Sequence, residues 1–150
     1  MITLSVNKNE VGEAFRAYVW QVQNRYLKQA MNSAAVVLET EYRNTLRQVA
    51  RVPGNKSFIP AWEAVANKVR MFKDSNGVWA IIGIKAGSDG KSLAPQAWMG
   101  EHGTVKRETE AGENRGIMPA QHYLAQVAAK AMPMAVDAFW TKLRSLVNAN

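Results

Sequence analysis

The sequence contains no cysteine. This absence excludes a disulfide framework, a cysteine-ligated zinc site, an iron–sulfur cluster and a thiol nucleophile. The longest nearly apolar run, Val78–Ile84, is far shorter than the roughly 20 residues that a membrane-spanning helix needs. The first seven residues lack the basic and apolar regions of a secretory signal. We therefore expect a soluble protein with no membrane partner and no visible export route.

A phosphate-binding loop is suggested only at first sight. Gly87–Ser92 resembles such a loop, but Lys85 stands where the motif needs its first glycine. The residues up to Pro95 do not predict a helix that begins at once, and without a helix N-terminus the anion loses its binding site. A flexible surface loop over residues 87–93 is the simpler interpretation.

Residues for catalysis or metal binding are also sparse. His102 and His122 are the only histidines, and Glu101-His102 lacks the second histidine of the HExxH zinc motif. Neither a Gly-x-Ser-x-Gly nucleophile turn nor a glycine-rich dinucleotide motif is present. We therefore expect no enzyme, no cofactor and no metal site.

The chain does have an ordinary globular composition with an excess of positive charge. Its 150 residues are 47% hydrophobic and 21% charged, which suits one domain with its own core. The net charge is +7, and residues 43–91 hold nine of the 19 basic residues but three of the 12 acidic ones. This basic middle is either a solvated surface or a contact for nucleic acid. The basic residues that would face a DNA path are Arg43, Arg47, Arg51, Lys56, Lys68 and Arg70.

Two apolar patterns occupy the first third of the chain. Ile2, Leu4 and Val6 alternate with polar residues, as in a short strand or in an extended arm over residues 1–7. Over residues 11–51, apolar residues recur mostly every three or four positions. That spacing predicts one long helix.

A β-hairpin is predicted in the middle of the chain. Asn76-Gly77 is a strong turn signal between Lys68–Phe72 and Val78–Lys85. The second strand is apolar on both faces, so we expect it to be central or covered. Before the hairpin, Pro60 could begin a short helix with Trp62, Val65 and Ala66 on its apolar face.

The last third of the chain predicts a helix preceded by loops. Ala97–Gly100 suggests a short strand or a buried turn, and the polar residues 104–116 suggest a mobile loop. Pro119 should open the last helix, and Pro133 should kink or split it. The expected fold class is α+β, with a long N-terminal helix and a kinked C-terminal helix packed on a small antiparallel sheet.

Two short motifs resemble those of a known family. Residues 97–104 contain an aromatic residue followed by Glu-x-Gly-Thr, and residues 119–124 read Pro-Ala-Gln-His-Tyr-Leu. This pair resembles the tail-completion, or neck, family of tailed-bacteriophage morphogenesis proteins. The family's Pro-x-x-Thr-Gly-x-Leu segment is replaced here by Val52–Ile59. The residues that carry the resemblance are Trp98, Glu101, Gly103, Thr104, Pro119, Ala120 and Leu124, with Tyr123 in place of the usual Phe.

The resemblance implies a non-enzymatic virion protein, assembled in the bacterial cytoplasm, that forms a ring at the head–tail junction or tail end. The ring would be sixfold and would contact other neck and tail proteins, such as terminator, tail-tube or head-closure proteins. On this reading the two motifs form an assembly interface, and the arm with Ile2, Leu4 and Val6 adds to a neighbour's sheet. The basic middle would contact genomic DNA through its phosphates, independently of base sequence.

The same residues allow other interpretations. Gly103 permits a positive φ, and Glu101 could bond backbone amides either at its own turn or on a neighbouring subunit. The motifs would then form a fold-defining corner. The chain also has five tryptophans, and at least one should anchor an interface. The alternative function is a small basic nucleic-acid-binding or regulatory domain.

Overall fold

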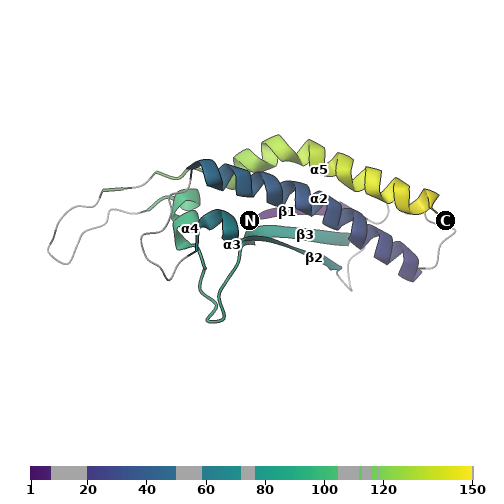
Figure 1. The fold of residues 1–150 in the computed structure, drawn as a ribbon, viewed down its shortest axis with the longest axis horizontal. Coiled ribbons are helices and arrows are strands. Elements are labelled where there is room, and N and C mark those ends of the chain that lie inside the picture. Colours follow the sequence, from purple (N-terminus) through teal and green to yellow (C-terminus); the bar gives the residue numbers. More distant parts are fainter. Residues whose placement is uncertain are drawn as a thin grey trace.

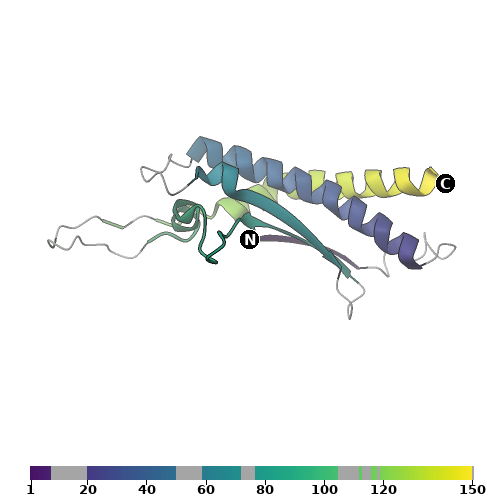
Figure 2. The ribbon, with the colours of Figure 1, turned by 60° about the horizontal axis from the view of Figure 1, so that its bottom comes forward.

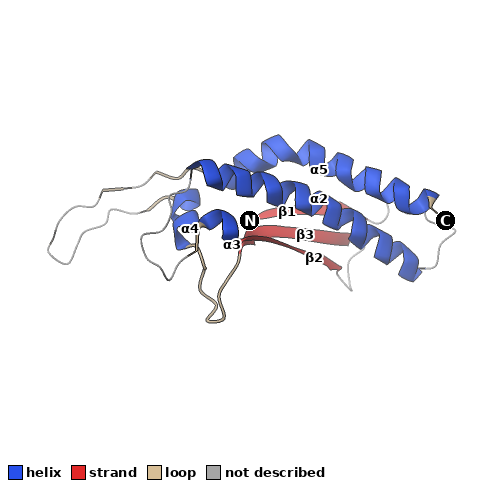
Figure 3. Ribbon diagram, in the orientation of Figure 1, coloured by secondary structure: helices blue, strands red, loops and turns tan. Residues whose placement is uncertain are grey.

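The computed structural model describes residues 1–7, 20–49, 59–71, 77–104, 112, 116–117 and 119–149. Its elements are β1 (Ile2–Asn7), α2 (Trp20–Val49), α3 (Ala61–Ala64), β2 (Val65–Met71), β3 (Gly77–Ile84), α4 (Pro95–His102) and α5 (Tyr123–Asn148). Figure 3 shows two long helices beside one small sheet. The α+β class expected from the sequence is confirmed.

β3 is the central strand of a three-stranded antiparallel sheet with the order β1-β3-β2 (Figure 1). Ile82 of β3 lies opposite Ile2 of β1 and Asn67 of β2. Because side chains alternate along a strand, Val78, Ala80 and Ile82 share one face, and all three are fully buried. The expectation that this apolar strand is central is confirmed.

α2 and α5 lie side by side over the buried face of the sheet (Figures 1 and 2). α2 packs on β2 and β3, whereas α5 packs mainly on α2. The core fills the space between the two layers. Its largest side chains are Tyr42, Phe139, Met31, Leu38, Leu46, Ile82, Val65, Val78 and Val127. No helix in the described part of the chain is long and apolar enough to cross a membrane.

α2 confirms the long apolar stripe over the residues that the structure describes. Leu27, Met31 and Leu38 lie on the buried side of the helix. Their spacing follows the helical repeat, so one face meets the sheet and α5. The expected beginning and end of this helix, in residues 8–19 and 50–58, lie outside the described residues.

β1 corrects the expectation of a free arm over residues 1–7. The segment is an edge strand of the chain's own sheet, paired with β3 throughout. Ile2 and Leu4 are 5% and 8% exposed, so their side chains belong to the core. The physical reason is that β3 needs an apolar neighbour on this side to complete the buried face. The strand interpretation of Ile2, Leu4 and Val6 is the one that the structure shows.

The hairpin is confirmed, since β2 and β3 pair antiparallel. Its turn, residues 72–76, lies outside the described residues. The loop over residues 87–93 is closed by its own backbone bonds. Gly87 N–H donates to the Lys91 carbonyl at 2.7 Å, and Gly90 N–H donates to the Gly87 carbonyl at 3.0 Å.

α3 is a single turn that Pro60 precedes, as expected, but it ends at Ala64. Val65 and Ala66, which were expected on its apolar face, already belong to β2. The Lys85 N–H donates to the Ala64 carbonyl at 2.8 Å. Pairing with β3 therefore draws the chain into the sheet directly after one helical turn.

α4 shows that the expected strand or turn at Ala97–Gly100 is wrong, because these residues are helical. Pro95 lies in the first turn of α4, where its fixed φ suits a helix and its missing N–H costs nothing. A helix therefore does begin soon after Ser92, contrary to expectation. Lys85 still occupies the position of the first glycine of a phosphate-binding loop.

α5 begins later than expected, at Tyr123 and not at Pro119. His122, just before the helix, has a left-handed backbone with φ of 51°. α5 then continues through Pro133 to Asn148, so the expected split is wrong. Pro133 and Ala129, four residues earlier, are both exposed, so water can reach the carbonyl that proline leaves unbonded.

The β1 side chains provide a first test of the fold. Replacing buried Leu4 by Ala should lower the free energy of unfolding by about 2–5 kcal/mol, because the substitution opens a cavity in the core. Replacing exposed Thr3 by Ala should change it by less than about 0.5 kcal/mol. Urea unfolding followed by circular dichroism measures both. Equal effects of the two substitutions would contradict the placement of β1 in the core.

Candidate assembly surface

The two sequence motifs meet at a corner between α4 and α5. The Glu101 Oε2 atom accepts a hydrogen bond from the Leu124 N–H at 3.0 Å, and Glu101 is only 7% exposed. The Gly100 carbonyl accepts from Gln121 N–H at 2.9 Å, and the Glu101 carbonyl accepts from His122 N–H at 3.3 Å. Amides at the start of a helix have no helical partner. Glu101 therefore caps α5 from a different element.

Two glycines fit α4 into this corner. Gly103 ends α4 with φ of 74°, the positive value expected for it. At Gly100, a Cβ atom would lie 2.8 Å from Cε2 of Tyr123, so the aromatic ring needs a residue without a side chain there. The corner interpretation of the motif thus applies to Glu101, Gly103 and Tyr123. Pro119 lies before α5 and is exposed.

Three further motif residues differ in their exposure. Thr104 and Ala120 are half-buried. Trp98 is 61% exposed on α4, and its ring lies 4.9 Å from the ring of His102, centroid to centroid. Trp98 is therefore the motif residue that a partner could reach most readily. The predicted mobile loop, residues 104–116, lies mostly outside the described residues.

Tyr42 lies close enough to this corner for the Glu101 carboxylate to affect its pKa. Burial raises the pKa of the Tyr42 hydroxyl, and the carboxylate of Glu101 and the hydroxyl of Tyr123 raise it further. Burial also lowers the pKa of the Met1 amino group, although Glu101 opposes this effect. Tyr42 thus stays neutral at ordinary pH, as suits its place in the core.

A cavity of about 450 Å³ lies between the sheet and α4. Lys68, Ile81 and Gly83 line it from the strands, and Trp98 and His102 line it from α4. The cavity also reaches Glu101, so it links the corner to the outer face of the sheet. Its walls are mainly apolar side chains with cations at the rim. This composition suits an anchoring side chain of a partner better than a reacting substrate.

The outer face of the sheet carries the second part of the candidate surface. Trp79 and Ile81 alternate with the buried residues of β3 and so point away from the helices. Arg70 lies opposite Trp79, and Lys68 lies opposite Ile81. In the described part of the chain, no helix is packed across this face (Figure 2). Trp79 and Ile81 are half-buried on this face, and cations rim the apolar stripe that they form.

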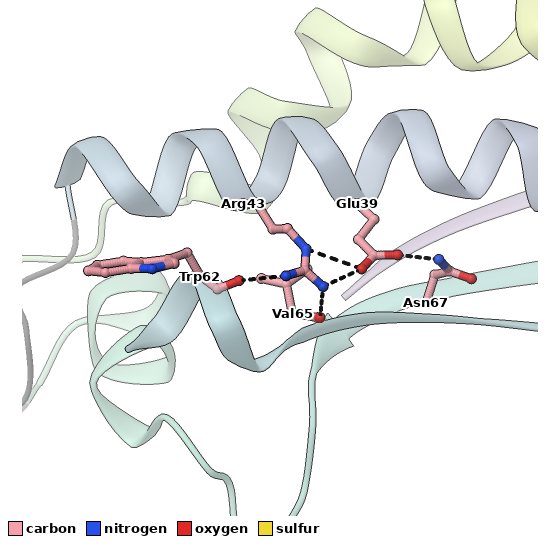
Figure 4. A network of polar contacts seen from close by, with 5 residues as sticks. All are labelled: Glu39, Arg43, Trp62, Val65 and Asn67. Atoms are coloured by element: carbon pink, nitrogen blue, oxygen red, sulfur yellow. Dashed lines mark hydrogen bonds and ion pairs between the residues drawn. The ribbon is translucent and has the colours of Figure 1, made fainter. Parts of the chain in front are cut away.

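The Arg43 guanidinium is bonded within the chain, and its contact with a DNA path stays a prediction. The guanidinium pairs with the Glu39 carboxylate at 2.6 Å and donates to the carbonyls of Trp62 at 3.3 Å and Val65 at 2.8 Å (Figure 4). The other Glu39 oxygen accepts from the Asn67 amide. The two carbonyl bonds of Arg43 and the bond between Glu39 and Asn67 hold α2 to α3 and β2. The sequence indicated the Glu39–Arg43 pair, since Glu and Arg four residues apart can pair on a helix.

The described members of the remaining basic set lie on different faces. Arg47 is exposed on α2, which covers the inner face of the sheet. Lys68 and Arg70 are exposed on the outer face. Arg51 and Lys56 lie outside the described residues. Among the described residues, Lys68 and Arg70 are thus the pair that shares one face, and their contact with DNA stays a prediction.

Within the described residues, no three His, Asp or Glu side chains gather as metal ligands would. Glu39 and Glu41 face different sides of α2, because Glu39 meets Arg43 and Glu41 pairs with Lys130 of α5 at 2.6 Å. The candidate surface residues that the sequence analysis did not single out are Trp79 and Ile81. Their signal was the second apolar face of Val78–Ile84.

Comparison with known proteins gives no further guidance: no family model, no curated protein and no solved structure matches the chain.

The Glu101 cap leads to a second prediction. Glu101→Ala should lower the free energy of unfolding by about 1–3 kcal/mol, because the Leu124 N–H loses its partner in a buried corner. His102→Ala, at the next and exposed position, should cost less than about 0.5 kcal/mol. Thermal or urea unfolding measures the difference. A cost at Glu101 no larger than at His102 would remove its capping role.

Arg43 and Arg47 form a matched pair for a third prediction. Arg43→Ala should cost about 1–3 kcal/mol of unfolding free energy, since it leaves two carbonyls and Glu39 without their partner. Arg47→Ala, one helical turn later and exposed, should change stability by less than about 0.5 kcal/mol. Urea titration of the two variants decides. If both are neutral, the network drawn in Figure 4 does not hold the elements together.

Proposed function

We propose that the protein is a non-enzymatic structural component of a tailed-bacteriophage neck or tail, which assembles into a ring and makes the tail competent to join the head. The proposal starts from the resemblance of the motifs at residues 97–104 and 119–124. The observation that carries it is the outer face of the sheet, across which no described helix packs. A large apolar side chain beside cations, such as Trp79 beside Arg70, is typical of a protein interface.

A closed ring requires two different patches on each copy, since one subunit's patch meets the other patch of the next subunit. The outer face with Trp79 and Ile81 supplies one patch. Val36 of α2 and Met134 of α5 are 47% and 48% exposed. They lie on the helices that cover the opposite face of the sheet, so they supply a second apolar patch. Two patches on opposite layers favour head-to-tail association over a symmetric dimer.

Trp98 extends the first patch along α4. It borders the cavity of about 450 Å³ that opens onto the same sheet face. We infer that a side chain from the neighbouring copy enters this cavity, with Trp98 as the anchor. The motif would then serve two roles, because Glu101 holds the corner while Trp98 contacts the partner.

The alternative is a small basic nucleic-acid-binding domain. It is favoured by one observation, namely that Lys68 and Arg70 lie beside Trp79 on an accessible sheet face. Cations that bind phosphate beside an aromatic ring that can stack on a base are common in single-strand binding proteins. Binding of the isolated protein to DNA at low salt with micromolar affinity or better would favour this alternative.

The assembly proposal is tested by microscopy of a phage lysate in which this gene carries an early stop. Separate DNA-filled heads and unjoined or misshapen tails are expected. Normal infectious particles would remove the assembly role and leave the nucleic-acid alternative.

The interface itself is tested with Trp79→Ala. We expect this variant to lose ring assembly in solution, measured by light scattering and negative-stain microscopy. Its thermal stability should stay close to that of the unchanged protein, because the side chain points away from the core. Trp79→Phe keeps an apolar aromatic ring and should keep most assembly. Rings that form equally well with alanine would place the interface elsewhere.

A further inference from the structure

β2 has an open edge, and the hydrogen bonds of the strand show which of its backbone groups point out from that edge. β2 lies at the end of the strand order, so one side of it faces no other strand. The Lys85 N–H bonds the Ala64 carbonyl, and Val65 turns its carbonyl the other way, to Arg43. In an antiparallel pair, backbone groups point alternately toward and away from the partner strand. The N–H and carbonyl of Val69 therefore point out from the open edge.

The first part of this edge is already occupied, and no described strand pairs with the second part. Arg43 bonds Val65, and Glu39 bonds the Asn67 side chain, so the chain itself covers the beginning of β2 (Figure 4). Around Val69 the structure instead has a shallow groove of about 440 Å³. The described residues that line this groove with Val69 are Arg25, Lys28, Gln29, Asn32 and Ser33 of α2 and Lys142 of α5.

The described lining of the groove is strongly positive. Arg25 and Lys28 are exposed, and the ion pairs among the described residues join Glu39 to Arg43 and Glu41 to Lys130. Among the residues that the structure describes, no acidic side chain lines the groove. On the other face of the same strand, Lys68 and Arg70 are also exposed. Cations thus flank the open edge of β2 on both of its faces.

We propose that the open edge of β2 near Val69 binds an acidic segment of a partner protein, which adds to the sheet as a further strand. The edge supplies alternating donors and acceptors at the spacing of a polypeptide backbone. Alternate side chains of the added strand would face Arg25 and Lys28 on one side and Lys68 and Arg70 on the other. Carboxylates at these positions match both sets of cations.

The edge favours a polypeptide over a nucleic acid. A phosphodiester backbone presents acceptors but no donor for the outward carbonyl of Val69, whereas a peptide presents both. The groove lies on the other face of β2 from the patch around Trp79, although an added strand would also use Lys68 and Arg70, which rim that patch. The groove cations Arg25 and Lys28 also differ from Arg43, whose guanidinium is already paired with Glu39 within the chain.

The binding test uses the full chain labelled with ¹⁵N and the acetylated hexapeptide Glu-Glu-Thr-Val-Glu-Glu, which places carboxylates on both faces of an added strand. We expect the amide signals of residues 68–71 to shift on titration. Two control peptides separate the causes of binding. One carries N-methyl groups on alternate amides, which removes main-chain donors and keeps the charge. The other has glutamine in place of glutamate, which keeps the backbone and removes the charge. Both should bind at least about tenfold more weakly.

The protein side is tested by the double variant Arg25→Glu and Lys28→Glu, which should weaken peptide binding by about tenfold or more. Arg144→Glu, an exposed charge reversal elsewhere on α5, is the matched control and should leave binding unchanged. Val69→Pro removes the outward donor and should also abolish binding. If that variant fails to fold, the charge variants decide the question alone.

Three results would overturn the proposal. If the N-methylated peptide binds as well as its parent, no strand is added and the groove attracts charge alone. If a short DNA duplex displaces the peptide and binds more tightly through Arg25 and Lys28, the groove is a phosphate site. Shifts confined to residues 79–81 would place the peptide on the outer face instead of the edge.

Discussion

The structure depends on covering one face of β3. Val78, Ala80 and Ile82 are fully buried, and a strand this apolar cannot remain in contact with water on that side. α2 and α5 supply the cover, while β1 and β2 extend the apolar surface to each side. At about 25 cal/mol per Å² of buried apolar surface, this layer contact is the main source of stability. The corner at Glu101 and the network at Arg43 hold the ends of the layers together.

The same arrangement leaves the outer face of the sheet without a helix across it in the described part of the chain. Both long helices lie on one side, and Trp79 and Ile81 of β3 lie on the other. The sheet has only three strands, so two of them are edges. A small two-layer fold therefore offers a face, an edge and a helical layer, each with a different chemistry. Assembly proteins use such separate surfaces to contact several neighbours.

The sequence predicted which helices and strands form better than it predicted where each of them begins and ends. Periodicity was sufficient for α2 and for the hairpin, because a long apolar stripe and an Asn-Gly turn are local signals. Local periodicity could not locate the start of α5. The helix begins after Pro119, where Glu101, which is distant in sequence, caps its first amides. The position of Arg43 also depends on distant carbonyls. The sequence showed that both faces of Val78–Ile84 are apolar. Only the packing shows which of the two faces meets the long helices.

The pairing of β1 with β3 has a consequence for how the chain is made. Ile2 leaves the ribosome before its strand partner, Ile82, which is synthesised 80 residues later. The face of α2 that meets α5 stays uncovered until α5 has emerged. Such distant contacts slow folding and leave apolar surface exposed during synthesis. The nascent protein is thus most open to chaperones, and most prone to aggregate, until α5 is complete.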